Sequence, residues 1–320
     1  RATEQYASLR KLLAEGRESI GLAGLPGGSK GLVLSTLAEE TGSPTVVVTP
    51  DQVSLRDMEM DLRSFGLDGV VSYPEDEMLP YDYHEPDRDL TGAQMEALHS
   101  IIMGECSVLV CTLRSYMKKV FLPGVFEGLL TGLSPGERFE TTELAERLSA
   151  LGYERHQIVE QKGQFAIRGA IMDIFEAGSG APFRIEFDDD RIGSIREFDI
   201  ESQRSAKTLD TVWIRPLSHL VVTEEGIGRL RKMIEVHSKG KGDETARRME
   251  LPLSRLESGI SFFGMEHYAP LMNPAGAVIE YFQRPPVVVL SAYQDLSREL
   301  ENFDEEIEKR YSALLEEGRV

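Results

Sequence analysis

The sequence is poor in cysteine and in basic residues, and it has no long apolar run. Its only cysteines, Cys106 and Cys111, cannot build a disulfide framework and are typical of buried, reduced thiols in a cytoplasmic protein. No apolar run approaches the roughly 20 residues that a membrane helix needs, and no basic-then-apolar leader opens the chain. We therefore expect a cytoplasmic protein without a membrane partner, and the start at Arg1 instead of methionine indicates an excised segment.

The shortage of basic residues also bears on the partners. The chain has 54 acidic and 35 basic residues, which gives a net charge of −19. Contacts from Lys and Arg to phosphate dominate the affinity of proteins for nucleic acids. The charge balance therefore argues against strong nucleic-acid binding by this chain alone and favours a protein partner.

Clusters of reactive side chains are missing as well. The six histidines show no metal-ligand spacing, no carboxylates form a recognisable acid–base pair, and no Ser-His-Asp or Cys-His order stands out. The acidic run Glu75–Glu77 follows an expected strand, as a metal-binding motif would, but a solvated loop is the default for such a run in an acidic protein. We predict no catalytic residue and no metal site.

The first 130 residues alternate between strand and helix patterns. Short apolar runs, three of them rich in valine, occur at Ser19–Ala23, Thr45–Thr49, Val70–Tyr73 and Ser107–Thr112. Apolar residues at helical spacing fill Leu55–Phe65 and Ala93–Met103. Because 320 residues exceed one ordinary core, we expect two or three compact units. Residues 1–130 are expected to form the first part of an α/β domain with a parallel sheet.

Residues 131–215 have a different pattern. A capped helix is expected at Thr141–Leu151, and strands follow from Gln164 to Trp213. Alternating Phe183, Ile185 and Phe187 predict a half-buried strand, joined to Ile192–Phe198 through an acidic turn as a hairpin. We interpret this segment as a small α+β domain inserted into the first domain.

Residues 216–320 are expected to be the second part of the α/β domain. The sequence predicts a helix at Glu225–His237, a loop at Ser238–Asp243 and a buried strand at Val287–Ser291 that could complete the parallel sheet. A charged amphipathic helix follows Ala292, with a stripe that includes Leu296, Leu300 and Leu314. Packing on the body of the chain is its expected use, although such a helix can also lead into a further domain.

A degenerate phosphate loop lies near the start of the chain. It comprises Gly24, Gly27, Gly28, Ser29, Lys30 and Gly31. A working loop has glycine before the lysine and a hydroxyl residue after it, which ligates magnesium. Here Ser29 and Gly31 take those places, so ATP hydrolysis is not expected. Weak phosphate binding at the helix N-terminus is one alternative, and a glycine-rich turn without a ligand is the favoured one.

Several longer stretches resemble one protein family. They are Leu79–Pro86, Val159–Gly169, Ile171–Phe175, Arg184–Phe187, Ser194–Asp199, Gln203–Ser205 and Gly264–Tyr268. In order and spacing they are similar to the front end of bacterial transcription-repair coupling factors. The excision-repair protein UvrB shares this region, but it keeps a working phosphate loop and a long aromatic hairpin. In this chain a helix is expected soon after Pro86, which leaves no room for that hairpin.

The resemblance implies a function. It implies a fold like half of a nucleotide-binding motor, interrupted by a domain on which UvrA, the damage sensor, docks. Such a module is non-catalytic and recruits UvrA to stalled RNA polymerase in transcription-coupled DNA repair. Contacts with RNA polymerase and DNA, and the use of ATP and magnesium, belong to other domains of the full-length family members. The alternative is a UvrB-like, ATP-dependent damage-verification protein that binds damaged DNA.

The resemblance also implies the docking residues. Arg168 and Arg184 match family arginines that contact UvrA, and the strand pattern predicts that both are exposed. Arg196 is assigned to the same patch. Asp188 stands where the family commonly has a phenylalanine that packs against UvrA, so one aromatic anchor is replaced by an acid. The alternative is that each arginine only pairs with an acid on its own sheet, such as Glu186.

Overall fold

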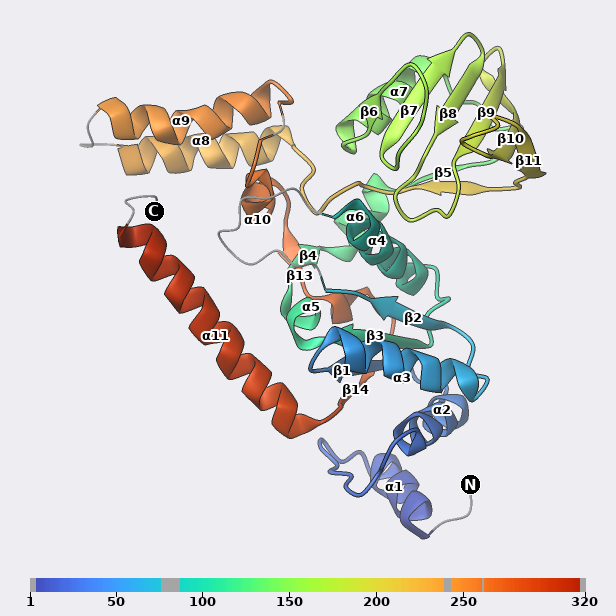
Figure 1. Cartoon of the computed structure of the whole chain (residues 1–320), viewed down its shortest axis with the longest axis vertical. Coiled ribbons are helices and arrows are strands. Elements are labelled where there is room, and N and C mark those ends of the chain that lie inside the picture. The colour runs from blue at the N-terminus through green and yellow to red at the C-terminus, as the bar shows by residue number, and fades with distance from the viewer. Residues whose placement is uncertain (1–3, 76–86, 239–242, 261, 317–320) are drawn as a thin grey trace.

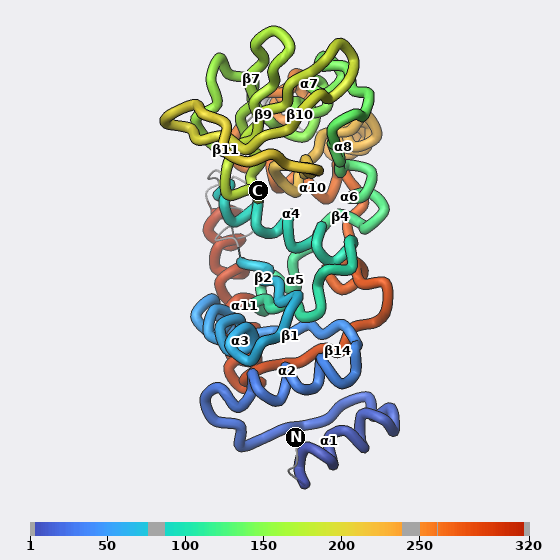
Figure 2. The backbone as a smooth tube through the Cα atoms, turned by 90° about the vertical axis from the view of Figure 1, so that its right-hand side faces the viewer, coloured from blue at the N-terminus to red at the C-terminus, as the bar shows by residue number. Residues whose placement is uncertain are grey.

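The computed structural model describes residues 4–75, 87–238, 243–260 and 262–316 of the chain (Figure 1). A parallel sheet with helices on both faces occupies the middle of an elongated body. A second sheet lies at one end, and the N-terminal helix α1 (Glu4–Ala14) lies at the other (Figure 2). A helical hairpin projects beside the second sheet, as Figure 1 shows.

The parallel sheet has four strands in the order β14 (Val287–Leu290), β1 (Thr45–Thr49), β3 (Val108–Thr112) and β2 (Val70–Tyr73). Every residue of β1 and β3 is buried, which explains their continuous apolar sequences. One face packs against α2 (Ser29–Thr41) and α3 (Gln52–Ser64), and the other packs against α4 (Arg88–Ile102). The predicted α/β class is therefore confirmed, and β14 completes the sheet as expected.

The strand predicted at Ser19–Ala23 is absent. Residues 17–28 contain no helix or strand, and Leu22 is 52% exposed. The run is short and contains Gly21, and glycine weakens strands because it offers no side chain for packing. In the described part of the chain, β14 is an edge strand whose outer side pairs with no other strand. The degenerate phosphate loop consequently follows an irregular segment and not a strand.

The second sheet is built from residues 154–208. Its six strands lie in the order β11 (Ser205–Thr208), β10 (Arg191–Phe198), β9 (Phe183–Asp188), β8 (Ile171–Ile174), β7 (Gln164–Arg168) and β6 (Glu154–Arg155). All neighbours are antiparallel except β6 and β7. The predicted hairpin of β9 and β10 is confirmed, and helix α7 (Thr141–Ala150) packs its leucines on one face of the sheet.

Two short strands mark where the chain enters and leaves this sheet domain. β5 (Thr131–Leu133) pairs antiparallel with β12 (Val212–Ile214). Residues about 80 positions apart thus become neighbours, and the α/β domain continues after β12. The segment is an insertion whose two ends are hydrogen-bonded to each other.

The remaining elements complete the α/β domain. They are α5 (Leu113–Met117), β4 (Val120–Phe121), α6 (Pro123–Leu129), α8 (Glu224–Ser238), α9 (Asp243–Glu257), α10 (Ala269–Met272), β13 (Ala275–Gly276), and the 3₁₀ turns Met265–Tyr268 and Val278–Tyr281. Helices α8 and α9 form the projecting hairpin and share a small core with α10. Of the loop predicted at Ser238–Asp243, residues 239–242 lie outside the described residues, as does the whole Leu79–Pro86 stretch.

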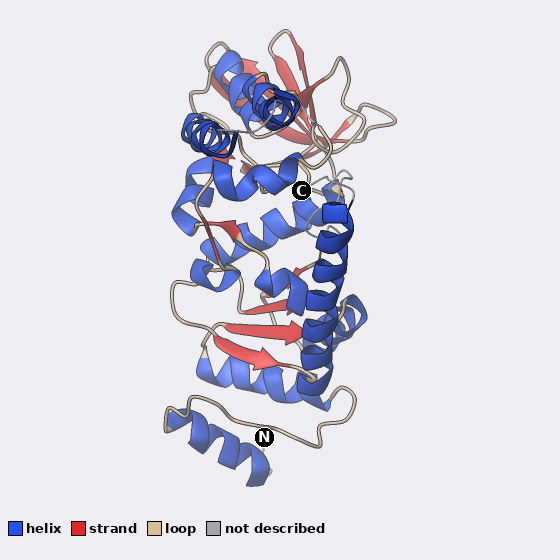
Figure 3. Ribbon diagram, turned by 90° about the vertical axis from the view of Figure 1, so that its left-hand side faces the viewer, coloured by secondary structure: helices blue, strands red, loops and turns tan. Residues whose placement is uncertain are grey.

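The long C-terminal helix α11 (Tyr293–Glu316) runs along the side of the body beside the parallel sheet (Figure 3). Leu296 and Leu314 of its predicted stripe are buried, whereas Leu300 is 39% exposed. The stripe is therefore only partly covered by the body of the chain.

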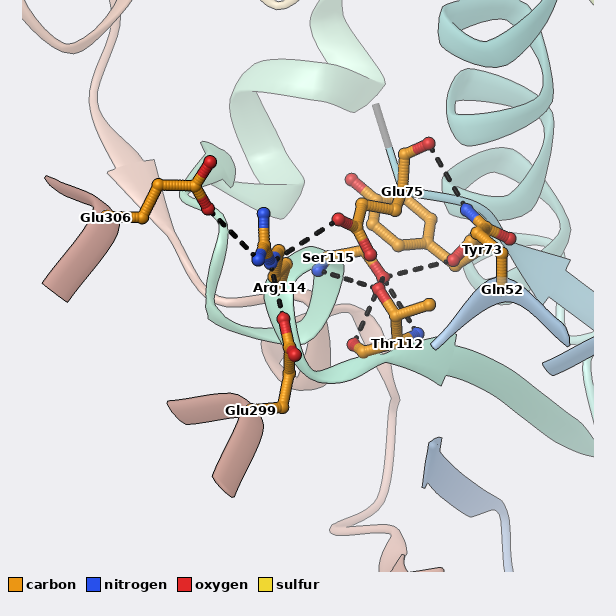
Figure 4. A network of polar contacts seen from close by, with 8 residues as sticks. All are labelled: Gln52, Tyr73, Glu75, Thr112, Arg114, Ser115, Glu299 and Glu306. Atoms are coloured by element: carbon orange, nitrogen blue, oxygen red, sulfur yellow. Dashed lines mark hydrogen bonds and ion pairs between the residues drawn. The ribbon is translucent and has the colours of Figure 1, made fainter. Parts of the chain in front are cut away.

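An arginine of α5, Arg114, joins α11 to the rest of the chain near the carboxyl ends of the parallel strands (Figure 4). Arg114 of α5 contacts Glu299 at 2.7 Å and Glu306 at 3.2 Å on α11, and Glu75 at 3.6 Å beyond β2. Its guanidinium also lies 4.9 Å from the centre of the Phe303 ring. Glu75 of the Glu75–Glu77 run is therefore an ion-pair partner of Arg114. The other two acids of that run lie outside the described residues.

The inserted domain is packed closely against α4. A Cβ added at Gly92 would lie 2.5 Å from the backbone of Ala177, so only glycine permits this approach. His99 of α4 lies with its ring centre 4.8 Å from that of Trp213, next to β5. Close by, the buried pair Glu176 and Arg215 forms two hydrogen bonds of 2.9 Å. The position of the inserted sheet is thus fixed by α4.

His99 makes this junction sensitive to acid. Burial, with a smaller contribution from Arg215, lowers the pKa of His99 from 6.5 to about 4. The unfolded chain therefore takes up a proton between pH 6.5 and 4 that the folded chain does not. The stabilisation from neutral His99 is complete above pH 6.5 and is lost as the pH falls toward 4, by up to about 3 kcal/mol.

We predict that native protein loses this increment of unfolding free energy on acidification, and that His99→Gln does not. Urea denaturation at several pH values, followed through Trp213, the single tryptophan, measures the difference. His237→Gln, at an exposed histidine of α8, is the matched control and should follow the native curve. Parallel curves for native protein and His99→Gln would contradict the prediction.

Candidate docking surface

The outer face of the inserted sheet carries the residues that the sequence singled out. On β9, Phe183, Ile185 and Phe187 point into the core under α7, so Arg184 and Glu186 lie on the opposite face. The register places Asp173 of β8 and Arg196 of β10 on either side of Arg184. The strands thus bring together on one surface side chains that are far apart in the sequence.

Asp173 is the centre of this arrangement. Its carboxylate is 2% exposed and accepts hydrogen bonds from Arg184 Nε at 2.6 Å and Nη2 at 2.9 Å. Arg168 Nη2 also donates to Asp173 Oδ2. The hydrogen bonds to Asp173 are the first cause of the raised pKa of Arg184, because they favour its charged form. Two arginines therefore share one buried acid.

The prediction that Arg184 is exposed is wrong, because only 14% of its side chain reaches solvent. Its guanidinium lies 4.7 Å from the centre of the Phe198 ring, and its Nη2 donates a hydrogen bond to Gln203 Oε1 in the loop after β10. These neighbours belong to β10 and the loop after it, which cover this part of the face. Alternation along a strand gives the face on which a side chain lies, but it does not show what covers that face.

Arg168 meets the expectation, with 46% of its side chain exposed. Arg168 and Arg184 do pair with an acid of their own sheet, and for these two arginines that acid is Asp173 and not Glu186. Sequence reasoning missed Asp173, although an acid between Met172 and Ile174 in a buried strand is a signal for a paired charge. Arg168 combines an ion pair with a substantial exposed surface.

Arg196 and Asp188 lie farther along the same sheet. Arg196 is 45% exposed, with Nη2 at 3.8 Å from Glu186 Oε2, and Ser194 Oγ donates to the same oxygen at 2.8 Å. Asp188 is exposed at the end of β9. Arg168 and Arg196 are therefore accessible arginines of the outer face, and the strands β8 and β9 separate them.

The degenerate phosphate loop lies apart from this surface, at the start of α2. Gly24 and Gly27 have positive φ angles of 76° and 51°, Gly28 precedes the helix, and Ser29 Oγ donates to the carbonyl of Pro26 at 2.6 Å. Lys30 is half-buried. The loop thus forms an ordinary glycine-rich helix start.

Asp61 of α3 explains why the hydroxyl residue is absent. A Cβ at Gly31 would lie 2.6 Å from the Cβ of Asp61, so Gly31 is required for the close packing of α2 on α3. The Asp61 carboxylate would also lie 3.4 Å from a Cβ at Gly28. A negative charge beside the turn opposes phosphate binding, which favours the turn without a ligand.

The other reactive groups of the described residues form no second site. Burial raises the pKa of the Cys106 and Cys111 thiols to about 12, so they are held as unreactive thiols. Within the described ranges, no three His, Cys, Asp or Glu side chains are grouped so that they could hold a metal ion. Over the same ranges, no helix is both long enough and apolar enough to cross a membrane.

We predict that Gly31→Ser lowers the free energy of unfolding by about 1–3 kcal/mol, because the new side chain overlaps Asp61. Urea denaturation measures the change. Gly128→Ser in α6, where a Cβ meets no atom within 4 Å, is the control and should cost little or add stability. Equal stability of the two variants would show that Gly31 is not a packing residue.

Known proteins resemble this chain both in its inserted segment and over most of its length. Residues 132–220 match the UvrB interaction domain. Over 312 residues the chain is 31% identical to the transcription-repair-coupling factor of Myxococcus xanthus, covering 91% of this chain and 25% of the relative. The Bacillus subtilis factor is 27% identical over 99% of the chain and 28% of the relative, and that of Haemophilus influenzae is 26% identical over 89% and 24%. The chain thus spans about a quarter of the length of these relatives. This chain is therefore similar over about nine tenths of its length to transcription-repair-coupling factors, and its residues 132–220 match the UvrB interaction domain, which confirms the resemblance identified from the sequence.

Proposed function

We propose that this chain is a non-catalytic docking module that binds UvrA through the outer face of its inserted sheet. In a full-length relative it would recruit UvrA to stalled RNA polymerase for transcription-coupled excision repair in the cytoplasm. The observation that carries the proposal is the exposed Arg168, held by a buried acid within the segment that matches the UvrB interaction domain.

The chemistry of the face suits an acidic protein partner. An arginine fork can hold a carboxylate at two points, and it binds more tightly when its conformation is already fixed. Arg168 is fixed by Asp173, and Arg196 lies near Glu186. Residues 131–215 contain 16 acidic and 11 basic residues, so these arginines are a local feature of an acidic domain. Asp188 supplies no aromatic anchor, which leaves the arginines to carry the affinity.

The remaining functions of the relatives are proposed to lie outside these 320 residues. The chain corresponds to about a quarter of a transcription-repair-coupling factor. Contacts with RNA polymerase and DNA, and an ATP- and magnesium-dependent motor, would belong to the other three quarters. In this chain the packing of Gly31 and the charge of Asp61 support a loop that holds no nucleotide.

We predict that Arg168→Glu weakens binding of purified UvrA at least about tenfold, because it reverses the charge of an accessible arginine of the face. Isothermal titration calorimetry measures the dissociation constant. Arg298→Glu on α11 is the control, since it makes the same charge change at a 70% exposed arginine far from the sheet in sequence.

The control variant should bind within about twofold of native protein. Equal weakening by both reversals would point to overall charge and not to this face. Undiminished binding by Arg168→Glu would remove the docking role of the face, and a native chain that does not bind UvrA would overturn the proposed function.

A second prediction concerns ATP. The native chain and Lys30→Ala should release phosphate from ATP at the same background rate, because Gly31 supplies no hydroxyl ligand for magnesium. A phosphate-release assay with magnesium present measures both rates. Turnover by the native chain that Lys30→Ala abolishes would establish the enzymatic alternative.

A further inference from the structure

We infer that Asp173 is a positioning residue, which presents Arg168 to the partner, and that Arg184 acts by holding Asp173 and does not contact the partner itself. The inference deepens the proposed function and rests on it. It divides a pair of arginines that look equivalent in the sequence into one contact residue and one supporting residue.

The exposures of the three side chains form a series. Asp173 is 2% exposed, Arg184 14% and Arg168 46%. The acid therefore lies deepest on the face, Arg184 is mostly covered, and Arg168 is the member that a partner can reach. A large contact area with a partner requires accessible surface, which Arg184 lacks.

The hydrogen bonds of Arg184 lead to the same conclusion. An arginine has five N–H donors, and Arg184 makes four hydrogen bonds within the chain, two with Asp173 and two with Gln203. The planar guanidinium of Arg184 also stacks over the ring of Phe198. Among the described residues Arg168 makes one hydrogen bond, to Asp173, so most of its guanidinium can serve a partner carboxylate.

Asp173 has a role that charge alone does not explain. It lies next to the docking arginines and cancels one of their two positive charges. If the face attracted an acidic partner only by charge, Asp173 would weaken docking. If the face works by fixing the direction of Arg168, Asp173 strengthens docking. The two views therefore predict opposite signs for the removal of its charge.

Asp173→Asn decides between them. We expect this variant to bind UvrA at least about tenfold more weakly than native protein, although the face loses a negative charge. Asp210→Asn is the matched control, because it makes the same change at an exposed acid of the inserted domain, and it should bind within about twofold of native protein. Unchanged or tighter binding by Asp173→Asn, with native protein binding normally, would overturn the inference and leave the proposed function standing.

A double-mutant cycle separates positioning from general support of the fold. If Asp173 acts through Arg168, then Asp173→Asn should weaken binding in the native chain and change it by less than about twofold in an Arg168→Gln background. A structural role would lower the fraction of binding-competent protein in both backgrounds. Calorimetry distinguishes these results, because a smaller competent fraction changes the stoichiometry and not the dissociation constant.

Arg184→Lys provides a second test if Asp173→Asn does not fold. It keeps the charge but cannot reproduce the two-point contact with Asp173. We expect affinity for UvrA to fall by about threefold to tenfold, with an unchanged salt dependence because the net charge is the same. An Arg184→Lys variant that binds as native protein does would show that Arg184 does not fix the acid, and would overturn the inference.

Discussion

The burial of β1 and β3 on both faces is the constraint on which the rest of the structure depends. Strands without a solvent-facing side need a helix layer on each face, and α4 supplies much of one layer. The same helix supports the inserted domain through the close approach at Gly92 and the contact of His99 with Trp213. The outer face with its arginines is thus positioned by a helix whose primary task is to cover the parallel sheet.

The sequence predicted secondary structure correctly wherever a local pattern alone determines it. Valine-rich runs gave the parallel strands 45–49, 70–73 and 108–112, and alternation gave the hairpin of β9 and β10. It failed at 19–23, where an apolar run of the same length stays irregular. Whether such a run pairs depends on a neighbouring edge and on the glycines within it, and neither can be judged from periodicity alone.

The candidate site was predicted less completely than the fold. Family resemblance and strand alternation correctly placed Arg168 and Arg184 on one face of the sheet. They could not show that Phe198 and Gln203 cover Arg184, because these residues come from another strand and a loop. Asp173 was overlooked for a related reason: an acid in an apolar strand becomes meaningful only when the register places it opposite an arginine.

The pairing of β5 with β12 brings the two ends of the inserted domain together. Its first and last residues are neighbours, so the parent fold spans the same short gap whether or not the domain is present. The entropy of closing a loop grows only slowly with its length, so the length of the inserted segment adds little to the entropic cost of closing the parent chain. A binding surface carried in this way can change in length without moving the two ends of the parent chain apart.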